Sequence, residues 1–457
     1  MTNLFVTTEN DNSHYLLRDV FGNILCDFYI EEKILENPIT TNDILIALLN
    51  PFICPTFRVS ILNPDETIKY VIPLEDIPSG GISYTETYQN GQRRSITLKL
   101  INKDGKYTPS INKGNKYYRN VNNFSTEKTK KIQSYQNILI WKNTKVRYDI
   151  GLRIKGHTAW FPKGVYIIGN SDLIQEDSNK QITLQLKDKF AKLEDNSGKL
   201  LTAYEILAGS KVKQVIQDLL NQDFGDGYSI DIKSFILPSS LYDFEVQADI
   251  KKEAGDTYGS ILLDIATQMS CECYYNEQGN LVFSLLDETV NDQNKPICWK
   301  YEIKNYDLIN LSSSYNFDEA INMVKVIGDN IDNGIFSALV VNNDPRSPVC
   351  IGRIGKCPEN PITDANVWSN VLAKDLAIYN LRKKSLNSLS LSANVKFNPL
   401  ITVDFLCEIE HAFFNFEREK CVINSISYSD DSGQMDLSIT NIQNLDFLNM
   451  GDGGYEV

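Results

Sequence analysis

Alternation of apolar and polar side chains with a period of two is the feature that most limits how this chain can fold. It is clearest in the segment KVRYDI at 145–150, where Val146, Tyr148 and Ile150 fall on one side of an extended chain. Similar runs occur at TFRVSIL, GISYTETY, RRSITLKLIN, QITLQLKDKF and GQMDLSITN, and turn residues such as Asn90-Gly91 separate neighbouring runs. This pattern is typical of strands with one buried face, so we expect a mainly β protein rich in hairpins.

Four segments carry the period of a helix instead. They are TTNDILIALLNP, KVKQVIQDLL, YGSILLDIATQM and the stretch at 362–384. We expect Thr41 or Asn42 to cap the first helix, Ser210 the second, and Asp256 or Thr257 the third, because small polar side chains satisfy the free N–H groups of a first turn. The third helix leads into CECYYNEQGNLVFSLL, whose central NEQG sequence predicts another hairpin.

The order of these elements predicts an α+β fold that is mainly β, with two β-barrels joined by a small α/β module. Before Thr56 the chain shows no regular strand pattern, and the polar stretch at 102–136 interrupts the strands as a long loop. The predicted parts are an N-terminal extension at 1–70, a first β-barrel at 71–200, an α/β insertion module at 201–310, a second β-barrel at 311–445 that contains the helix at 362–384, and a flexible tail at 446–457.

Charge and cysteine content narrow the possible functions. The formal net charge of −14 argues against nucleic-acid binding as the main task, because phosphate recognition needs a basic surface. No apolar run reaches the length of a membrane span, and the first residues lack the basic and apolar regions of a signal peptide. We therefore expect no membrane span and synthesis in a cytosol. Nine cysteines scattered among apolar runs predict reduced, buried thiols.

The search for catalytic or metal-binding residues finds no convincing set. The three histidines, His14, His157 and His411, occur without the spacing of a metal or nucleophile motif. Cys271 and Cys273 are one residue too close for a zinc knuckle, so packed thiols are the preferred interpretation over a metal site. Phosphate-loop, calcium-loop and G-x-S-x-G patterns are also missing. We predict no catalytic residue, no cofactor and no bound metal, and hence no enzyme.

About half of the chain resembles the baseplate hub proteins of tailed phages and of related contractile injection machines. The resemblance lies in the order of elements between Ile82 and Leu286, and it resumes at INMVKVIGDN. The segments that carry it are SITLKLINKDGKYTP, VRYDIGLRI followed by WFPKGVYIIGNSDL, ITLQLKDKFAKLED, AYEILAGSKVKQVIQDLL, and DTYGSILLDIATQMSCECYYNEQGNLVFS, the best match. The first 70 residues and the stretch at 102–136 lie outside this resemblance.

This resemblance implies two barrels of the tail-tube type in each subunit and a homotrimer of such subunits. The resulting ring would adapt the tail tube to the central spike within a virion baseplate, after assembly in the host cytoplasm. The implied partners are the tail tube protein, the central spike, and baseplate wedge or distal tail proteins. An acidic lumen would let DNA pass without specific binding, in keeping with the negative charge.

Aromatic strand positions are the candidates for the assembly interface: Tyr148, Trp160, Phe161 and Tyr166. Packing inside the core is an equally good interpretation for each of them. Three other functions stay open at this point. The chain could be another baseplate component, such as a wedge or distal tail protein. It could be a carbohydrate-binding or cell-wall-cleaving tail module, or a bacterial structural β protein unconnected with phages.

Overall fold

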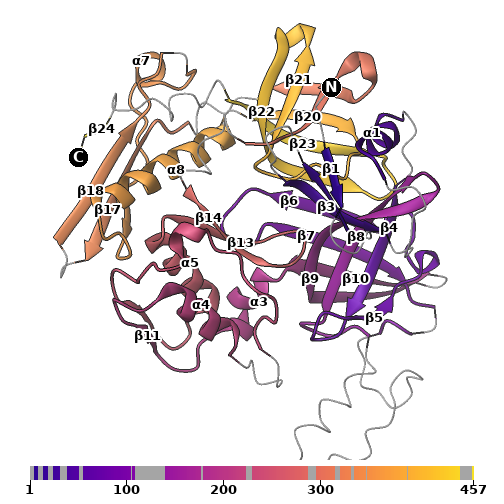
Figure 1. Ribbon diagram of the computed structural model, residues 1–457, viewed down its shortest axis with the longest axis horizontal. Helices are drawn as coiled ribbons and strands as arrows, with labels where there is room; N and C mark the ends of the chain where they lie inside the picture. Colours follow the sequence, from indigo (N-terminus) through magenta and orange to yellow (C-terminus); the bar gives the residue numbers. More distant parts are fainter. Residues whose placement is uncertain are drawn as a thin grey trace, which may run out of the picture.

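Sixteen strands of the computed structural model join into one large sheet, in which a single pairing, β15 with β21, is parallel and the others are antiparallel. The structure describes residues 5–8, 14–18, 24–30, 39–50, 55–103, 105–108, 139–176, 179–222, 229–286, 295–313, 320–330, 334–345, 347–388, 390–442 and 455–456. The mainly β character predicted from the alternating runs is thus confirmed. Figure 1 shows the early strand β6 and the late strand β22 close to each other, and these two strands are paired.

The first half of this sheet is a path of six hydrogen-bonded strands that we call the first arc. Its order is β4 (Thr56–Leu62), β8 (Lys145–Ile154), β9 (His157–Glu176), β10 (Asn179–Asp188), β7 (Arg94–Ile101) and β6 (Ile82–Thr87). The turn between β8 and β9 has positive φ angles of 51° at Lys155 and 88° at Gly156, as a tight hairpin turn requires. Gly91 likewise has a φ of 84° in the loop between β6 and β7, which confirms the hairpin predicted there.

The second half is another path of six strands, the second arc. Its order is β15 (Ile297–Glu302), β21 (Leu406–His411), β22 (Phe416–Ser429), β23 (Gln434–Asn441), β20 (Leu391–Lys396) and β16 (Leu308–Ser313). The end of β22 also pairs with β6, from Ser425 opposite Thr87 to Ser429 opposite Ser83, and this joins the two arcs directly. Within the described residues no pairing closes either arc into a ring, so the two closed barrels stay a prediction.

The N-terminal residues are more regular than expected. The strands β1 (Phe5–Thr8), β2 (His14–Arg18) and β3 (Ile24–Ile30) form a meander that extends the large sheet through β9. These strands are short, so their alternation was too brief to recognise in the sequence. Helix α1 (Thr41–Leu49) forms as predicted, but its cap is Thr40, one residue earlier than expected. Thr40 and Asp43 make a capping box, each side chain accepting the other residue's backbone N–H.

A second hydrophobic core, between Phe190 and Phe283, belongs to a module of short helices and hairpins that we call the α/β module. It contains α3 (Phe190–Glu194), α4 (Val212–Leu220), α5 (Tyr258–Gln268), the strand pair β11 (Tyr204–Ile206) and β12 (Ile250–Lys252), and the hairpin β13 (Cys271–Tyr275) and β14 (Leu281–Leu285). Thr257 caps α5, as predicted, whereas Ser210 does not cap α4: Lys211 occupies that position without a side-chain bond.

The remaining elements form a four-stranded sheet beside helix α8 (Asn370–Ser388), at the left of Figure 1. Its strands are β19 (Ile362–Asp364), β17 (Met323–Asn330), β18 (Gly334–Val341) and β24 (Tyr455–Glu456). The helix predicted from residue 362 therefore begins eight residues later, at Asn370. Residues 362–364 pair with β17, and the Ser369 hydroxyl accepts the N–H of Leu372 in the first turn of the helix.

Two predictions concern segments that the structure describes only in part. In the tail at 446–457 the structure describes Tyr455 and Glu456, which pair with Val340 and Leu339 of β18. The flexible tail stays a prediction. Most of the long loop predicted at 102–136 lies outside the described residues.

Candidate functional site: the junction between the arcs and the module

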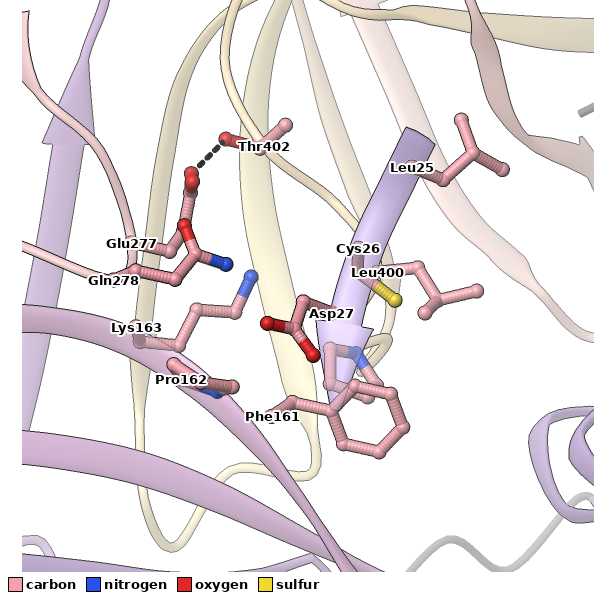
Figure 2. Close-up of a pocket in the computed structure, with 11 residues that line it drawn as sticks. Leu25, Cys26, Asp27, Phe161, Pro162, Lys163, Glu277, Gln278, Leu400 and Thr402 are labelled. Carbon is pink, nitrogen blue, oxygen red and sulfur yellow. Dashed lines mark hydrogen bonds between the residues drawn. The ribbon is translucent and has the colours of Figure 1, made fainter. Parts of the chain in front are cut away.

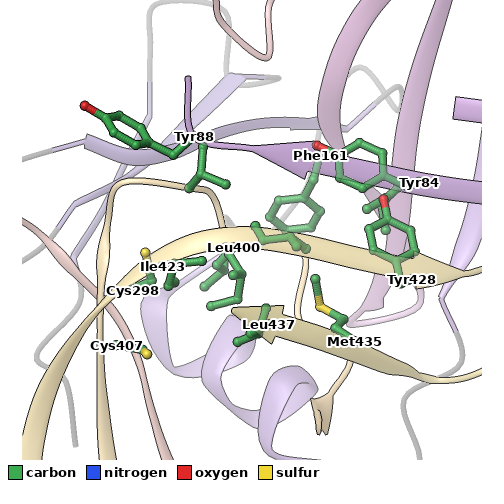
Figure 3. Packing of buried hydrophobic residues seen from close by; sticks show 14 of the residues in the cluster. Tyr84, Tyr88, Phe161, Cys298, Leu400, Cys407, Ile423, Tyr428, Met435 and Leu437 are labelled. Atoms are coloured by element: carbon green, nitrogen blue, oxygen red, sulfur yellow. The ribbon is translucent and has the colours of Figure 1, made fainter. Parts of the chain in front are cut away.

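A cluster of tyrosines lies where the two arcs meet. Tyr84 of β6 stacks on Tyr428 of β22 with 4.7 Å between ring centroids, and the Tyr428 hydroxyl donates to that of Tyr148, on β8, at 3.3 Å. Phe397 packs edge-on against Tyr428 at 5.1 Å. All four rings are buried, and Figure 3 shows Tyr84 and Tyr428 among the packed side chains. Aromatic packing thus fixes the two arcs against each other beyond their backbone pairing.

A first buried ion cluster joins the first arc to the α/β module. The Arg94 guanidinium lies 2.6 Å from a carboxylate oxygen of Glu86 and 2.5 Å from one of Glu277, in the turn of the β13–β14 hairpin. Arg94 also donates to the carbonyl oxygen of Tyr275 at 2.7 Å. Burial alone would lower the pKa of Arg94, but the carboxylates of Glu277 and Glu86 outweigh it and raise that pKa well above its usual range.

A second buried cluster adds helix α8 to this junction. Arg93 donates to Glu272 of β13 at 2.8 Å, and its guanidinium lies 3.4 Å from the ring centroid of Tyr274. The Tyr88 hydroxyl donates to Glu272 as well. Arg382 of α8, fully buried, donates to Asp404 at 3.0 Å. These contacts bring together residues from the first arc, the module and the C-terminal part of the chain.

A third cluster forms around Glu66, at the tip of the β4–β5 hairpin, where β5 spans Ile68–Val71. Its carboxylate accepts from Lys145 and Lys189 at 2.8 Å each and lies 3.3 Å from Lys233. Lys189 also reaches Asp231 of the module at 2.7 Å. Burial alone would raise the pKa of Glu66, but Lys189 and Lys145 outweigh this effect and lower it to about 2. The hairpin tip is thus pinned between the first arc and the module.

A small cavity lies beside the first cluster (Figure 2). Its volume is about 30 Å³, which is room for one or two water molecules and too little for a substrate. Lys163 of β9 lines it and donates to the carbonyl oxygen of Ile401 at 3.0 Å. Burial lowers the pKa of Lys163, and Glu86 and Glu277 partly offset this. The cavity therefore belongs to the junction as a packing feature.

The predicted assembly residues all lie on β8 and β9, close to this junction. Tyr148, Phe161 and Tyr166 are buried within the chain: Phe161 stacks on Phe28 of β3, and the Tyr166 hydroxyl donates to the carbonyl oxygen of Lys163. These three residues therefore lie in the core, which was the alternative interpretation of their sequence positions. Trp160 is half-buried and stacks on the Arg58 guanidinium at 4.3 Å. A role for these four residues in assembly stays a prediction.

The charged residues of the junction were not predicted. The sequence offered two signals, the adjacent Arg93 and Arg94 just after a turn, and Glu272 between two cysteines in an otherwise apolar strand. A charged side chain in or next to an apolar strand is expected to be buried when the strand packs on both of its faces. A buried charge in turn needs a partner of opposite charge. Glu86 lies opposite Arg94 in the β6–β7 hairpin, but the other partners lie far away in the chain, so the clusters as a whole could be found only from the structure.

Cysteines and histidines of the described residues form no metal-binding group: no three of the His, Cys, Asp and Glu side chains there come together in a suitable cluster. Every cysteine that the structure describes has a free thiol, as predicted, and Cys407 lies opposite Cys421 in neighbouring strands. The three histidines are on separate strands, β2, β9 and β21. Among the described helices, none is long and apolar enough to cross a membrane.

Comparison with known proteins identifies the fold. No protein-family model and no curated protein matches the sequence. The 43 kDa tail protein of prophage MuSo2 from Shewanella oneidensis superposes over 85% of this chain and 99% of its own, with a TM-score of 0.51 and 14% identity. The tail protein from Neisseria meningitidis MC58 covers 84% of this chain and 96% of its own, with a TM-score of 0.50 and 12% identity.

A third structure, the prophage tail protein gp18 from Listeria monocytogenes EGD-e, covers 84% of this chain and 94% of its own, with a TM-score of 0.46 and 10% identity. Identities this low establish the fold alone. This chain has the fold of the first two tail proteins. The resemblance to tail proteins that the sequence suggested is therefore confirmed at the level of the fold.

Proposed function

We propose that this chain is the structural hub protein of a phage tail baseplate, and that three copies form a ring that adapts the tail tube to the central spike. The observation that carries the proposal is the fold shared with two tail proteins over about 85% of the chain. The role is architectural, and the chain acts without catalysis or cofactor.

The strand order supports two barrels of the tail-tube type. Each arc contains six strands, and in the second arc the first and last strands, β15 and β16, follow each other in the chain across the turn at 303–307. Curling the second arc into a barrel would bring these two end strands together. We keep the proposed division into an extension at 1–70, barrels at 71–200 and 311–445, the module at 201–310 and a tail at 446–457.

Within this proposal the partners are the tail tube protein, the central spike, and baseplate wedge or distal tail proteins, and the site of action is the virion baseplate after assembly in the host cytoplasm. DNA would pass through the ring without specific binding. The net charge of −14 supports that passage, since an acidic wall repels the phosphate backbone.

Solution mass tests the proposal directly. Light scattering coupled to size exclusion, followed by electron microscopy of negatively stained particles, is expected to give three times the chain mass of 51.9 kDa and ring-shaped images. A sixfold mass would favour a distal tail ring, and a mass reached only with other proteins would favour a wedge. A monomer that stays single at high concentration and with purified tail tube and spike proteins would overturn the hub.

A further inference from the structure

We propose that one face of the large sheet, lined by small uncharged side chains from both arcs, is the surface along which duplex DNA passes. This inference rests on the ring under Proposed function and names the wall of its channel. We call this surface the hydroxyl face. It consists of two rows of residues that cross β7, β6, β22, β23, β20 and β16, strands that are neighbours in that order.

The rows follow residues that lie directly opposite each other in neighbouring strands. The first row consists of Ser95, Thr85, Ser427, Asp436, Asn394 and Asn310. The second row runs beside it and consists of Thr87, Ser425, Ser438, Ser392 and Ser312. All of these residues are exposed or half-buried, whereas Tyr84, Ile426 and Leu437, their neighbours along the strands, are buried. The sheet therefore has an apolar core side and a polar outer side that continues from the first arc into the second.

The hydroxyl face is poor in charge. Asp436 is the one charged side chain in the two rows, although charged residues make up 23% of the chain. The Asn394 amide donates to the Asp436 carboxylate at 2.8 Å, so this charge is bonded within the face. Surfaces that meet only solvent usually carry about 25–35% charged residues. Contact with water alone therefore does not account for the composition of these rows.

Cations lie at the margins of the hydroxyl face. Lys99 of β7 and Lys187 of β10 are exposed on the side of the first arc. Arg93 bonds Thr87 through the backbone, but its guanidinium is buried in the ion pair with β13. Lys396 of β20 donates to a carbonyl oxygen of helix α1 at 2.6 Å. No cation therefore stands within the two rows to hold a phosphate group.

The side chains of the rows also lack the other anchors that retain a partner. Proteins dock on exposed apolar patches, single-stranded nucleic acids stack on aromatic rings, and duplexes are held by lysine and arginine. The rows contain none of these groups. The hydroxyl face thus suits a polyanion that moves along it without being held, while the net charge of −14 keeps phosphates from settling at longer range.

The width of the hydroxyl face fits a channel shared by three copies. Neighbouring strands lie about 4.8 Å apart, so six strands span about 29 Å. Three such faces side by side, with the strand tilt usual in barrels, would enclose a channel roughly 35 Å across between facing backbones. Serine and threonine are short, so most of this width stays open, enough for a DNA duplex.

Cations placed on the hydroxyl face test the inference. Thr85→Arg with Ser392→Arg puts two guanidinium groups on exposed positions of different strands in each copy. The purified ring of this variant is expected to bind linear duplex DNA, with an affinity that falls about 10³-fold between about 50 and 200 mM salt. Covalently closed circular DNA of the same sequence is expected not to bind, because it cannot thread a closed ring. Wild type is expected to bind neither.

Gln214→Arg with Gln217→Arg, at exposed positions of α4, is the matched control of equal charge and is expected to bind neither DNA. Light scattering checks the mass and a thermal melt by circular dichroism checks folding. Thr85→Arg alone, expected to show weaker binding of linear DNA, replaces the double variant if that variant does not fold.

A folded ring variant that gains no binding of linear DNA would overturn the hydroxyl face as the channel wall. Equal binding of circular DNA, or equal binding by the Gln214→Arg, Gln217→Arg control, would overturn it as well, because the cations would then act from an outer surface. In all three cases the ring itself stands. A wild-type chain that stays monomeric would instead remove the proposed function, so the two failures are distinguishable.

Discussion

Arg93 and Glu272, 179 residues apart in the chain, form a buried ion pair with 2.8 Å between the guanidinium Nη2 and the carboxylate Oε2. Their side chains are only 4% and 1% exposed. The pair connects the β6–β7 hairpin of the first arc to β13 of the α/β module. A buried pair of this kind contributes little net stability as a pair, yet it is costly to break from one side.

Glu272→Ala is therefore expected to lower the free energy of unfolding by about 3–5 kcal/mol, because the Arg93 charge is left buried without its partner. The double variant Arg93→Met with Glu272→Leu is expected to recover most of that loss, since no charge remains. Urea unfolding followed by fluorescence measures both. Glu253→Ala, at an exposed position of the module, serves as the control. A loss below about 1 kcal/mol for Glu272→Ala would contradict the ion pair.

Acid is expected to weaken the attachment of the β4–β5 hairpin through Glu66. Its pKa in the folded protein is about 2, below the ordinary 4.5, so its contribution is fully present above pH 4.5 and is lost as the pH falls towards 2. That contribution is at most roughly 3 kcal/mol. Stability measured by urea unfolding from pH 6 to pH 2.5 should fall less steeply in Glu66→Gln than in the wild type.

The comparison with Glu66→Gln is needed because Asp188 changes stability in the opposite direction. Burial raises the pKa of Asp188 to about 6, although the backbone N–H groups of Arg94 and Arg93 act against this effect. Its folded form therefore holds a proton more tightly than the unfolded chain, and this contribution is lost as the pH rises through 6. Parallel pH curves for the wild type and Glu66→Gln would contradict the role given to Glu66.

Gly328 of β17 is expected to tolerate no side chain. A Cβ atom there would lie 2.4 Å from the carbonyl oxygen of Val367, which is backbone and cannot move aside. Gly328→Ala should lower the melting temperature by several degrees, in keeping with an overpacking cost of about 1–3 kcal/mol. Gly352→Ala is the matched control, because its Cβ would meet only the Cys350 sulfur at 4.0 Å. Equal melting temperatures for the two variants would contradict the close contact.

Trp160 offers a test of core packing against assembly. Trp160→Leu removes the ring that stacks on Arg58 and is expected to cost about 1 kcal/mol of folding stability, measured by urea unfolding. Trp160→Phe keeps an aromatic face and should lose less. If Trp160 acts only within the chain, the particle mass of both variants matches the wild type. A lower mass with unchanged stability would assign the residue to the interface between copies.

The sequence predicted best those features whose cause is local. The hairpin at Asn90-Gly91 was found because its turn needs a positive φ angle, which Gly91 accepts. Thr257 was recognisable as a cap because its hydroxyl bonds a backbone N–H three residues later. Alternation likewise identified strands with one buried face, such as β6 and β7.

Features that depend on distant partners escaped prediction. From the sequence, residues 362–364 are compatible with the first turn of a helix, but in the structure they pair with β17. The short strands β1 to β3 join the large sheet through the pairing of β3 with β9. Glu86 lies opposite Arg94 in the β6–β7 hairpin and is therefore a local partner. The other buried partners of Arg93, Arg94 and Glu66 come from other parts of the chain, and nothing local to these residues indicates them. Pairing over such separations is set by the packed structure as a whole.

The pairing of β6 with β22 also sets the order in which parts of the chain can fold during synthesis. The N–H of Ile82 donates to the carboxylate of Asp430, 348 residues later, so one side of β6 has no partner until the ribosome has made β22. Contacts between residues so far apart in the chain form slowly. Until they form, the unpaired edge of β6 can pair with strands of other nascent chains. Completion of the C-terminal strands is therefore the step that commits the first arc to its native state and ends its exposure to aggregation.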